Sequence, residues 1–147
     1  MLPQPKVVFA LDETSKTAAA TATALIDTLG FDHLVLAVKA GTADVVSNKP
    51  TVLKLQEADT TDASNLANIA GFVGGTDFAI PNANTAATAT LQNTYQFNVD
   101  LRGRKRYIGL SISPATTQLI KAVAVLSRGE QGVISAAKAN AMVLVQG

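Results

Sequence analysis

Four basic residues surround a single glycine in the run Asp100-Leu101-Arg102-Gly103-Arg104-Lys105-Arg106-Tyr107. Guanidinium and ammonium groups bind carboxylates and phosphates, so such a cluster could recognise an acidic protein surface or a nucleic acid. The whole chain carries a net charge of only +1, which gives no general attraction for nucleic acid. The functional interpretation of the cluster is therefore docking on an acidic protein surface. The candidate binding residues, called the basic turn below, are Arg102, Arg104, Lys105 and Arg106.

Two other interpretations of the basic turn stay open. It could be a solvated tip that keeps a sheet edge soluble. It could also bind nucleic acid, because Tyr95 and Tyr107 flank it and could stack on bases, although one short patch disfavours this. Exposed ion pairs contribute only about 0.2–1 kcal/mol each. The basic turn would therefore orient a partner, and buried apolar area at an interface would hold it.

The residues needed for catalysis or metal binding are scarce. The chain has one histidine, His33, and no cysteine. A hydrolytic triad needs a histidine beside a serine nucleophile and a carboxylate; Asp27 and Asp32 lie near in sequence, but no Gly-x-Ser-x-Gly motif exists. Metal sites built from imidazole and thiolate are excluded. We predict a histidine on the polar face of a strand, no enzyme activity, no metal site and no cofactor.

Two further motifs have simple structural interpretations. The run Asp59-Thr60-Thr61-Asp62 resembles a calcium loop but lacks the central glycine and the closing glutamate, so it predicts a solvated turn. The run Gly71-Phe72-Val73-Gly74-Gly75 is rich in glycine, but no Gly-Lys-Ser/Thr follows it. It therefore predicts a β-turn or bulge and not a phosphate-binding loop.

Length and composition limit the class of protein. The 147 residues predict one domain with a self-sufficient core. No apolar run reaches the roughly 18 residues of a membrane span, and the N-terminus lacks the pattern of a secretory signal, so we expect synthesis in a cytoplasm and no membrane partner. Charged residues make up only 16% of the chain. A β-protein with so little charge tends to associate through its edges, which favours an oligomer or a larger particle.

Apolar and polar residues alternate along much of the chain, which indicates strands with one buried face. The clearest case spans 95–113, where a break at Gly103 predicts a tight β-hairpin. For residues 12–24 we expect a loop followed by a strand, because no helical apolar stripe is present. The other expected strands are Lys6–Ala10, Asp32–Lys39, Thr51–Glu57, Ile69–Val73, Asp77–Ile80, Gln118–Ser127 and Ala141–Val145.

Short strands separated by turn signals predict an all-β fold, an antiparallel β-sandwich of about eight strands. That number suits a jelly roll or a related Greek-key sandwich. We expect extended arms at both ends: an N-terminal arm or edge strand over 1–10, the sandwich over 11–128 and a C-terminal arm over 129–147.

Four segments in this order resemble a family of tailed-bacteriophage proteins. The segments are Leu53–Asp59, Ile69–Thr76, Phe97–Tyr107 and Ala122–Glu130, and the resemblance spans roughly residues 25–130. The chain is similar to capsid decoration, or cement, proteins. The resemblance implies a jelly-roll-like structural protein of the virion, on the outer capsid surface between subunits of the major capsid protein, as a homodimer or homotrimer. It assigns no particular residue to a site.

A second function stays open beside this one. A β-sandwich of this size could be a small tail or fibre module that binds a receptor or a carbohydrate. Sugar sites usually use exposed aromatic rings, and the chain has no tryptophan and only 5% aromatic residues, which counts against this alternative. An enzyme ranks last, because no catalytic constellation is present.

Overall fold

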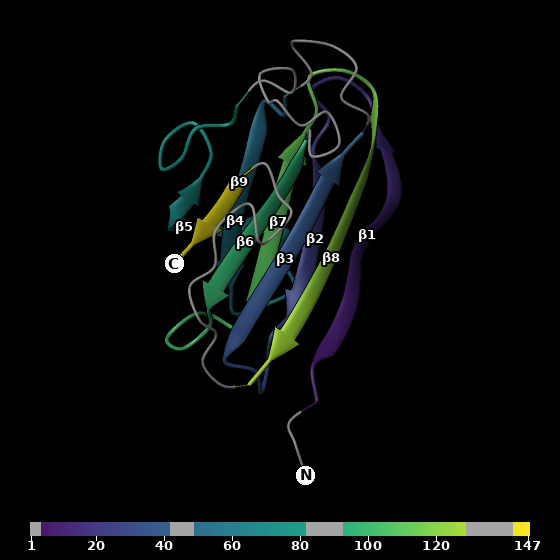
Figure 1. Cartoon of the computed structure of the whole chain (residues 1–147). Helices are drawn as coiled ribbons and strands as arrows, with labels where there is room; N and C mark the ends of the chain where they lie inside the picture. Colours follow the sequence, from purple (N-terminus) through teal and green to yellow (C-terminus); the bar gives the residue numbers. More distant parts are fainter. Residues whose placement is uncertain (1–3, 42–48, 82–92, 129–142) are drawn as a thin grey trace.

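The computed structural model describes residues 4–41, 49–81, 93–128 and 143–147. These residues form nine β-strands and one short 3-10 helix, arranged as two sheets packed face to face (Figure 1). The predicted all-β sandwich is confirmed. The five-stranded sheet has the order β1-β8-β3-β6-β9, and the four-stranded sheet has the order β2-β7-β4-β5.

The strands of the five-stranded sheet are β1 (Lys6–Lys16), β3 (His33–Ala40), β6 (Thr94–Asp100), β8 (Gln118–Ser127) and β9 (Val143–Gln146). The strands of the four-stranded sheet are β2 (Ala22–Asp27), β4 (Val52–Ala58), β5 (Ala67–Val73) and β7 (Tyr107–Ser113). The 3-10 helix η1 (Ala63–Asn65) lies between β4 and β5.

The first eight strands have the connectivity of a jelly roll. β1 pairs with β8, β2 with β7, β3 with β6 and β4 with β5, all antiparallel. This is the pattern of one long hairpin of four strand pairs that wraps into two sheets. β9 adds the one parallel pairing found among these strands, alongside β6.

The core lies between the sheets and is filled from alternate positions of each strand. Leu34, Leu36 and Val38 of β3 point inward and are essentially inaccessible to solvent. Phe97 of β6 lies at the centre of an aromatic group, with ring centroids 6.3 Å from Phe72 and 5.9 Å from Phe78. Such offset and edge-to-face contacts are the preferred geometries of aromatic pairs.

The hairpin predicted over 95–113 does not form. β6 and β7 form, but they belong to different sheets, and the segment 101–106 crosses from one sheet to the other. The predicted turn does occur there: Gly103 has φ +81°, and the Arg104 N–H donates to the Leu101 carbonyl at 3.0 Å. In a jelly roll the partners of β6 and β7 are β3 and β2, so this turn is a corner between sheets.

Two shorter predictions also need correction. Residues 12–16 continue β1 and are not a loop, although bulges interrupt β1 between Phe9 and Thr14. Asp77–Ile80 is not a strand, because Phe78 makes only an isolated bridge to Gly74. Gly71 has φ +87° and lies where the pairing of β4 and β5 shifts register, which confirms the predicted bulge.

The two ends of the described chain lie on opposite edges of the five-stranded sheet (Figure 1). β1 is the edge strand at the N-terminal side and runs past residue 10 to Lys16. β9 lies within residues 129–147 and forms the other edge, while residues 129–142 of the expected C-terminal arm lie outside the described ranges.

Candidate interaction surfaces

The basic turn lies at the corner between β6 and β7, where each of its side chains pairs with a carboxylate. Arg102 contacts Asp100 at 2.7 Å, and Arg106 contacts Asp27 at 2.7 Å. Lys105 Nζ lies 3.2 Å from Asp59 Oδ2, and Arg104 Nη1 lies 4.0 Å from Glu57 Oε1. The fold thus brings together the four basic residues predicted from sequence and adds four acidic residues. Three of these come from the ends of β2 and β4.

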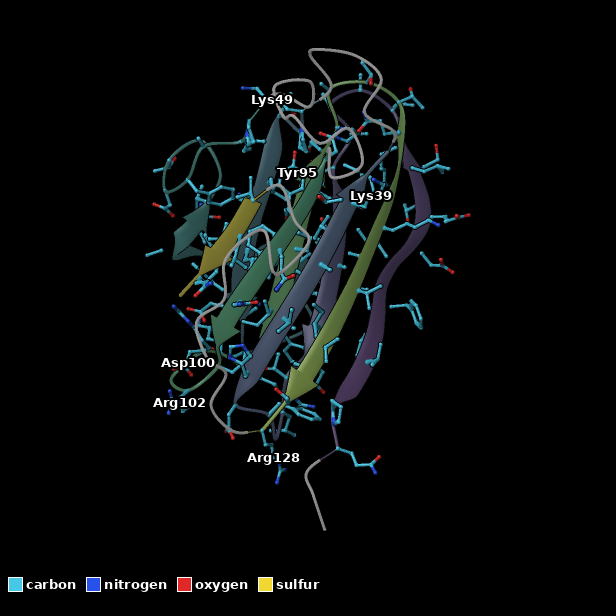
Figure 2. The ribbon with its side chains drawn as sticks, viewed as in Figure 1. Lys39, Lys49, Tyr95, Asp100, Arg102 and Arg128 are labelled. Carbon is cyan, nitrogen blue, oxygen red and sulfur yellow. The ribbon has the colours of Figure 1, made fainter. Side chains whose placement is uncertain are left out.

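Two of the four carboxylates of this corner, Asp27 and Asp100, have lowered pKa values. Hydrogen bonds from Arg106 and from the Leu29 N–H lower the pKa of Asp27 to about 2. Hydrogen bonds from the Arg102 side chain and N–H lower the pKa of Asp100 to about 2. Figure 2 shows Asp100 and Arg102 close together at the end of β6. Both residues of each pair are partly exposed, so solvent screens the attraction.

Charge balance changes what the basic turn can do. The four positive side chains each lie within 4.0 Å of a negative side chain, so their charges largely cancel and the corner is not a concentrated positive surface. Its pairs connect the end of β2 and the end of β4 to the turn, which favours a structural role. Direct contact of Arg102, Arg104, Lys105 and Arg106 with a capsid stays a prediction.

The other sequence motifs occupy ordinary structural positions. His33 begins β3, opposite Asp100 on one side and Ser127 on the other. Asp62 accepts a hydrogen bond from the Ser64 N–H at 2.9 Å and caps η1, so the Asp59–Asp62 run is a turn. Over the described part of the chain, no three His, Cys, Asp or Glu side chains gather into a group that could hold a metal ion. Within the same ranges, no helix is long and apolar enough to span a membrane.

The chain matches no protein-family model and no curated protein.

The outward face of the five-stranded sheet carries an apolar patch that the sequence reasoning missed. Val7, Val125 and Val35 lie opposite one another on β1, β8 and β3, and Phe9, Val123 and Ala37 form the next row. Residues that lie directly opposite in a sheet share a face. These six residues are called the outer stripe below. Phe9 is 73% exposed and Val7 is 56% exposed.

A signal for the outer stripe was present in the sequence. Alternation predicts one buried and one polar face, but the segments Ala122–Leu126 and Leu34–Val38 are apolar at every position. Uninterrupted apolar strands are typical of sheets with both faces covered. The inner face of these strands is covered by the four-stranded sheet, and the outer face keeps Ala37 and much of Phe9 exposed.

A surface pocket lies beside the outer stripe, at the end of β3 and the beginning of β8. Its volume is about 460 Å³. Among the described residues, its lining includes Glu13, Lys39, Gly41, Gln118, Leu119 and Lys121. We call it the two-lysine pocket, because Lys39 and Lys121 face each other in the pairing of β3 with β8. Figure 2 shows Lys39 near the end of β3.

The polar groups of the two-lysine pocket are unevenly paired. Glu13 forms an ion pair with Lys121, which lowers the pKa of Glu13 and raises that of Lys121. Gln118 is 7% exposed, and neither its amide nitrogen nor its amide oxygen has a hydrogen-bond partner. A buried carboxamide without partners is unusual in a native fold and calls for an explanation.

Proposed function

We propose that this chain is a structural protein of a phage virion that binds the outer surface of the capsid. It would stabilise contacts between subunits of the major capsid protein, after synthesis in the host cytoplasm. Two features support the proposal: the four sequence segments that resemble decoration proteins, and a jelly roll with a partly exposed apolar face. Catalysis has no part in it.

The outer stripe is the observation that carries the proposal. Isolated exposed apolar residues are normal, but contiguous apolar patches mark interaction surfaces. The outer stripe is contiguous across three strands, because its residues lie directly opposite one another. Burial of this patch against the capsid would contribute most of the binding free energy, because exposed ion pairs contribute little.

A decoration protein can bind firmly even where each contact is modest. When several linked copies bind one capsid, the first contact raises the effective concentration of the others, so the overall avidity exceeds the affinity of each contact. This fits self-association as a homodimer or homotrimer, which we include in the proposal. β1 and β9 are the edge strands of the five-stranded sheet as described, and an edge strand could also pair with a neighbouring extended segment by strand addition. In β1 the pairing with β8 is regular from Lys6 to Phe9 and shifts register beyond Phe9.

The test is binding to heads of the parent phage prepared without this protein. We expect saturable binding with a fixed copy number per head, and density for a β-sandwich at regular outer positions by cryo-electron microscopy. The double variant Val7→Thr/Phe9→Ser should bind at least ten-fold more weakly. Leu29→Ser is the matched control, because Leu29 is 67% exposed but lies in the turn after β2 and is not part of the outer stripe.

The alternative is a tail or fibre module that binds a receptor or carbohydrate. The two-lysine pocket is the observation that favours it, because pockets of a few hundred Å³ are the usual size for small ligands. Finding the chain at the tail and absent from heads would replace the capsid proposal with this one.

A further inference from the structure

We propose that the outward edge of β1, the edge that faces away from β8, pairs with the same edge of a second copy of this chain. The two β1 strands would run antiparallel around a two-fold axis at Val8. This inference rests on the self-association included in the proposed function and adds its surface and geometry. Three observations support it: the direction of the β1 peptide groups, the bulge that limits regular pairing, and the fit of the two outer stripes.

The start of β1 is an apolar edge with little charge. Among the described strands β1 pairs with β8 alone, and Figure 1 shows it at one margin of the sheet. The run Lys6–Leu11 contains one lysine followed only by apolar residues. Soluble proteins usually protect such an edge with charges, proline or a covering segment, because it can pair with another chain. An edge of this composition therefore favours a partner strand.

The register of the sheet shows which peptide groups of β1 point outward. The Gly41 N–H donates to the Leu119 carbonyl at 2.7 Å, and the pairing of β3 with β8 has no register shift. Leu119 and every second residue after it in β8 therefore direct their peptide groups toward β3. The residues between them direct theirs toward β1. Ala124 is one of these, and it lies opposite Val8.

Val7 and Phe9 alternate with Val8, so their N–H and C=O groups point to the outward edge of β1. Groups in this position can hydrogen-bond to an added antiparallel strand. If Val7 of one copy lies opposite Phe9 of the other, the two residues exchange both of their hydrogen bonds. The two-fold axis repeats this pair, and it places Val8 of one copy opposite Val8 of the other.

The bulge in β1 selects this register. β1 is regular against β8 over Lys6–Phe9 and shifts register beyond it. A two-fold axis at Val8 keeps both hydrogen-bonded pairs within this run. An axis one residue earlier would require an N–H from Pro5, which proline lacks. An axis one residue later would require Leu11, which lies past the register shift. The pairing therefore closes on itself, since a two-fold contact uses the same surface of both copies.

Pairing at Val8 would join the outer stripes of the two copies. Residues that lie directly opposite across a strand pair share a face of the sheet, so the row of Val7 in one copy would continue into the row of Phe9 in the other. The two Lys6 side chains would lie at opposite ends of the pairing, where like charges do not meet. The dimer would therefore present one wider apolar patch to the capsid.

The expected dimer is weak in free solution. A single short strand pair buries less than the roughly 1,200 Å² of standard stable interfaces, so we expect dissociation in the micromolar to millimolar range. Copies held side by side on one capsid would pair more readily, because the shared support raises their effective concentration.

Sedimentation velocity of the purified chain over a range of concentrations tests the dimer. We expect a concentration-dependent dimer that Val7→Pro weakens about ten-fold or more, because proline removes an outward N–H but no hydrogen bond to β8. Val7→Thr is the matched control, since threonine keeps the N–H and the β-branched shape, and it should dimerise like the unchanged chain. Circular dichroism checks that each variant is folded. A chain that stays monomeric at millimolar concentration would overturn the inference.

Cysteine cross-linking tests the register, even if Val7→Pro does not fold. The chain has no cysteine. The two Val8 residues would form a non-hydrogen-bonded pair with Cα atoms about 4.5 Å apart, within the roughly 4.4–6.8 Å range of disulfides. The two Phe9 residues would be displaced by a further two positions, about 7 Å along the strands. Val8→Cys should therefore form an intermolecular disulfide about ten-fold faster than Phe9→Cys.

Exposure alone predicts the opposite order. Phe9 is 73% exposed and Val8 is half-buried, so random collisions would cross-link Phe9→Cys faster. That result would overturn the proposed pairing.

The outcomes separate this inference from the proposed function. A chain that dimerises through β1 but does not bind phage heads supports the edge pairing and overturns the capsid proposal. A chain that binds heads and forms a dimer unaffected by Val7→Pro overturns only the assignment to β1. A homotrimer without a dimer would also overturn it, because a two-fold pairing of β1 joins only two copies.

Discussion

The carboxylate of Asp27 accepts two hydrogen bonds from the guanidinium of Arg106, from Nε at 3.0 Å and from Nη2 at 2.7 Å. Asp27 is the last residue of β2, and Arg106 immediately precedes β7, the strand that pairs with β2. The Arg106 guanidinium carbon also lies 5.0 Å from the centre of the Tyr107 ring. This bidentate pair therefore fixes the corner between the sheets to the end of the β2–β7 ladder.

Acid should destabilise the fold through this corner. The pKa values of Asp27 and Asp100 are about 2, below the ordinary value of 3.8. A carboxyl with a lowered folded pKa stabilises the protein above its unfolded pKa and loses that contribution as the pH falls through the folded pKa. We expect the free energy of unfolding to fall between about pH 5 and pH 2. Urea titrations across this range measure it.

The matching variant is Asp27→Asn/Asp100→Asn, which should show a shallower fall in stability over the same pH range. An equally steep fall in this variant would mean that other carboxyl groups cause the acid sensitivity.

The corner also depends on the conformation of Gly103. Its φ of +81° is left-handed, and no atom lies within 4 Å of the position that a Cβ would occupy. Gly103→Ala should therefore lower the free energy of unfolding by about 1–2 kcal/mol, because alanine disfavours the left-handed backbone conformation. Gly103→Asn should cost less, because asparagine tolerates this conformation better. Urea denaturation of both variants tests the order; equal stability of all three proteins would contradict it.

The sequence predicted the strands better than their partners. Alternation located Gln118–Ser127 with the bounds that β8 has, because the period of two reflects which face is buried. Pairing is a property of the whole fold. β6 and β7 are buried on nearly all positions, so their pattern fits a hairpin and a crossing between sheets equally well. The six residues that separate β6 from β7 argue against a hairpin, because tight hairpin loops have about two residues.

The basic turn and the outer stripe were likewise only partly predictable from the sequence. The basic turn was visible in sequence because its members are adjacent, but Arg106 pairs with a residue 79 positions away. The acidic partners of the basic turn could therefore not be predicted without the strand order, and the sequence pattern does not give that order. The outer stripe likewise depends on β1, β8 and β3 lying side by side, and these strands are distant in the chain.

Two phenylalanines in the same sandwich should differ sharply in their contribution to stability. Phe97 is fully buried between Phe72 and Phe78, whereas Phe9 is 73% exposed. Phe97→Ala should lower the free energy of unfolding by about 3–5 kcal/mol. Phe9→Ala should change it by no more than about 0.5 kcal/mol. Chemical denaturation of each variant checks this; a large loss from Phe9→Ala would mean that the outer stripe stabilises the isolated chain.

Capsid binding should depend less on the basic turn than on the outer stripe. Arg102 has a side chain that is 64% exposed and lies 2.7 Å from Asp100, so a neighbouring carboxylate already compensates its charge. We expect Arg102→Gln/Asp100→Asn, which leaves the net charge unchanged, to weaken binding to heads by less than about three-fold, or roughly 0.6 kcal/mol. Binding measured at several salt concentrations would compare this pair with Val7→Thr/Phe9→Ser. A ten-fold loss from the Arg102 pair, with a reduced salt dependence, would instead make the basic turn the main capsid contact.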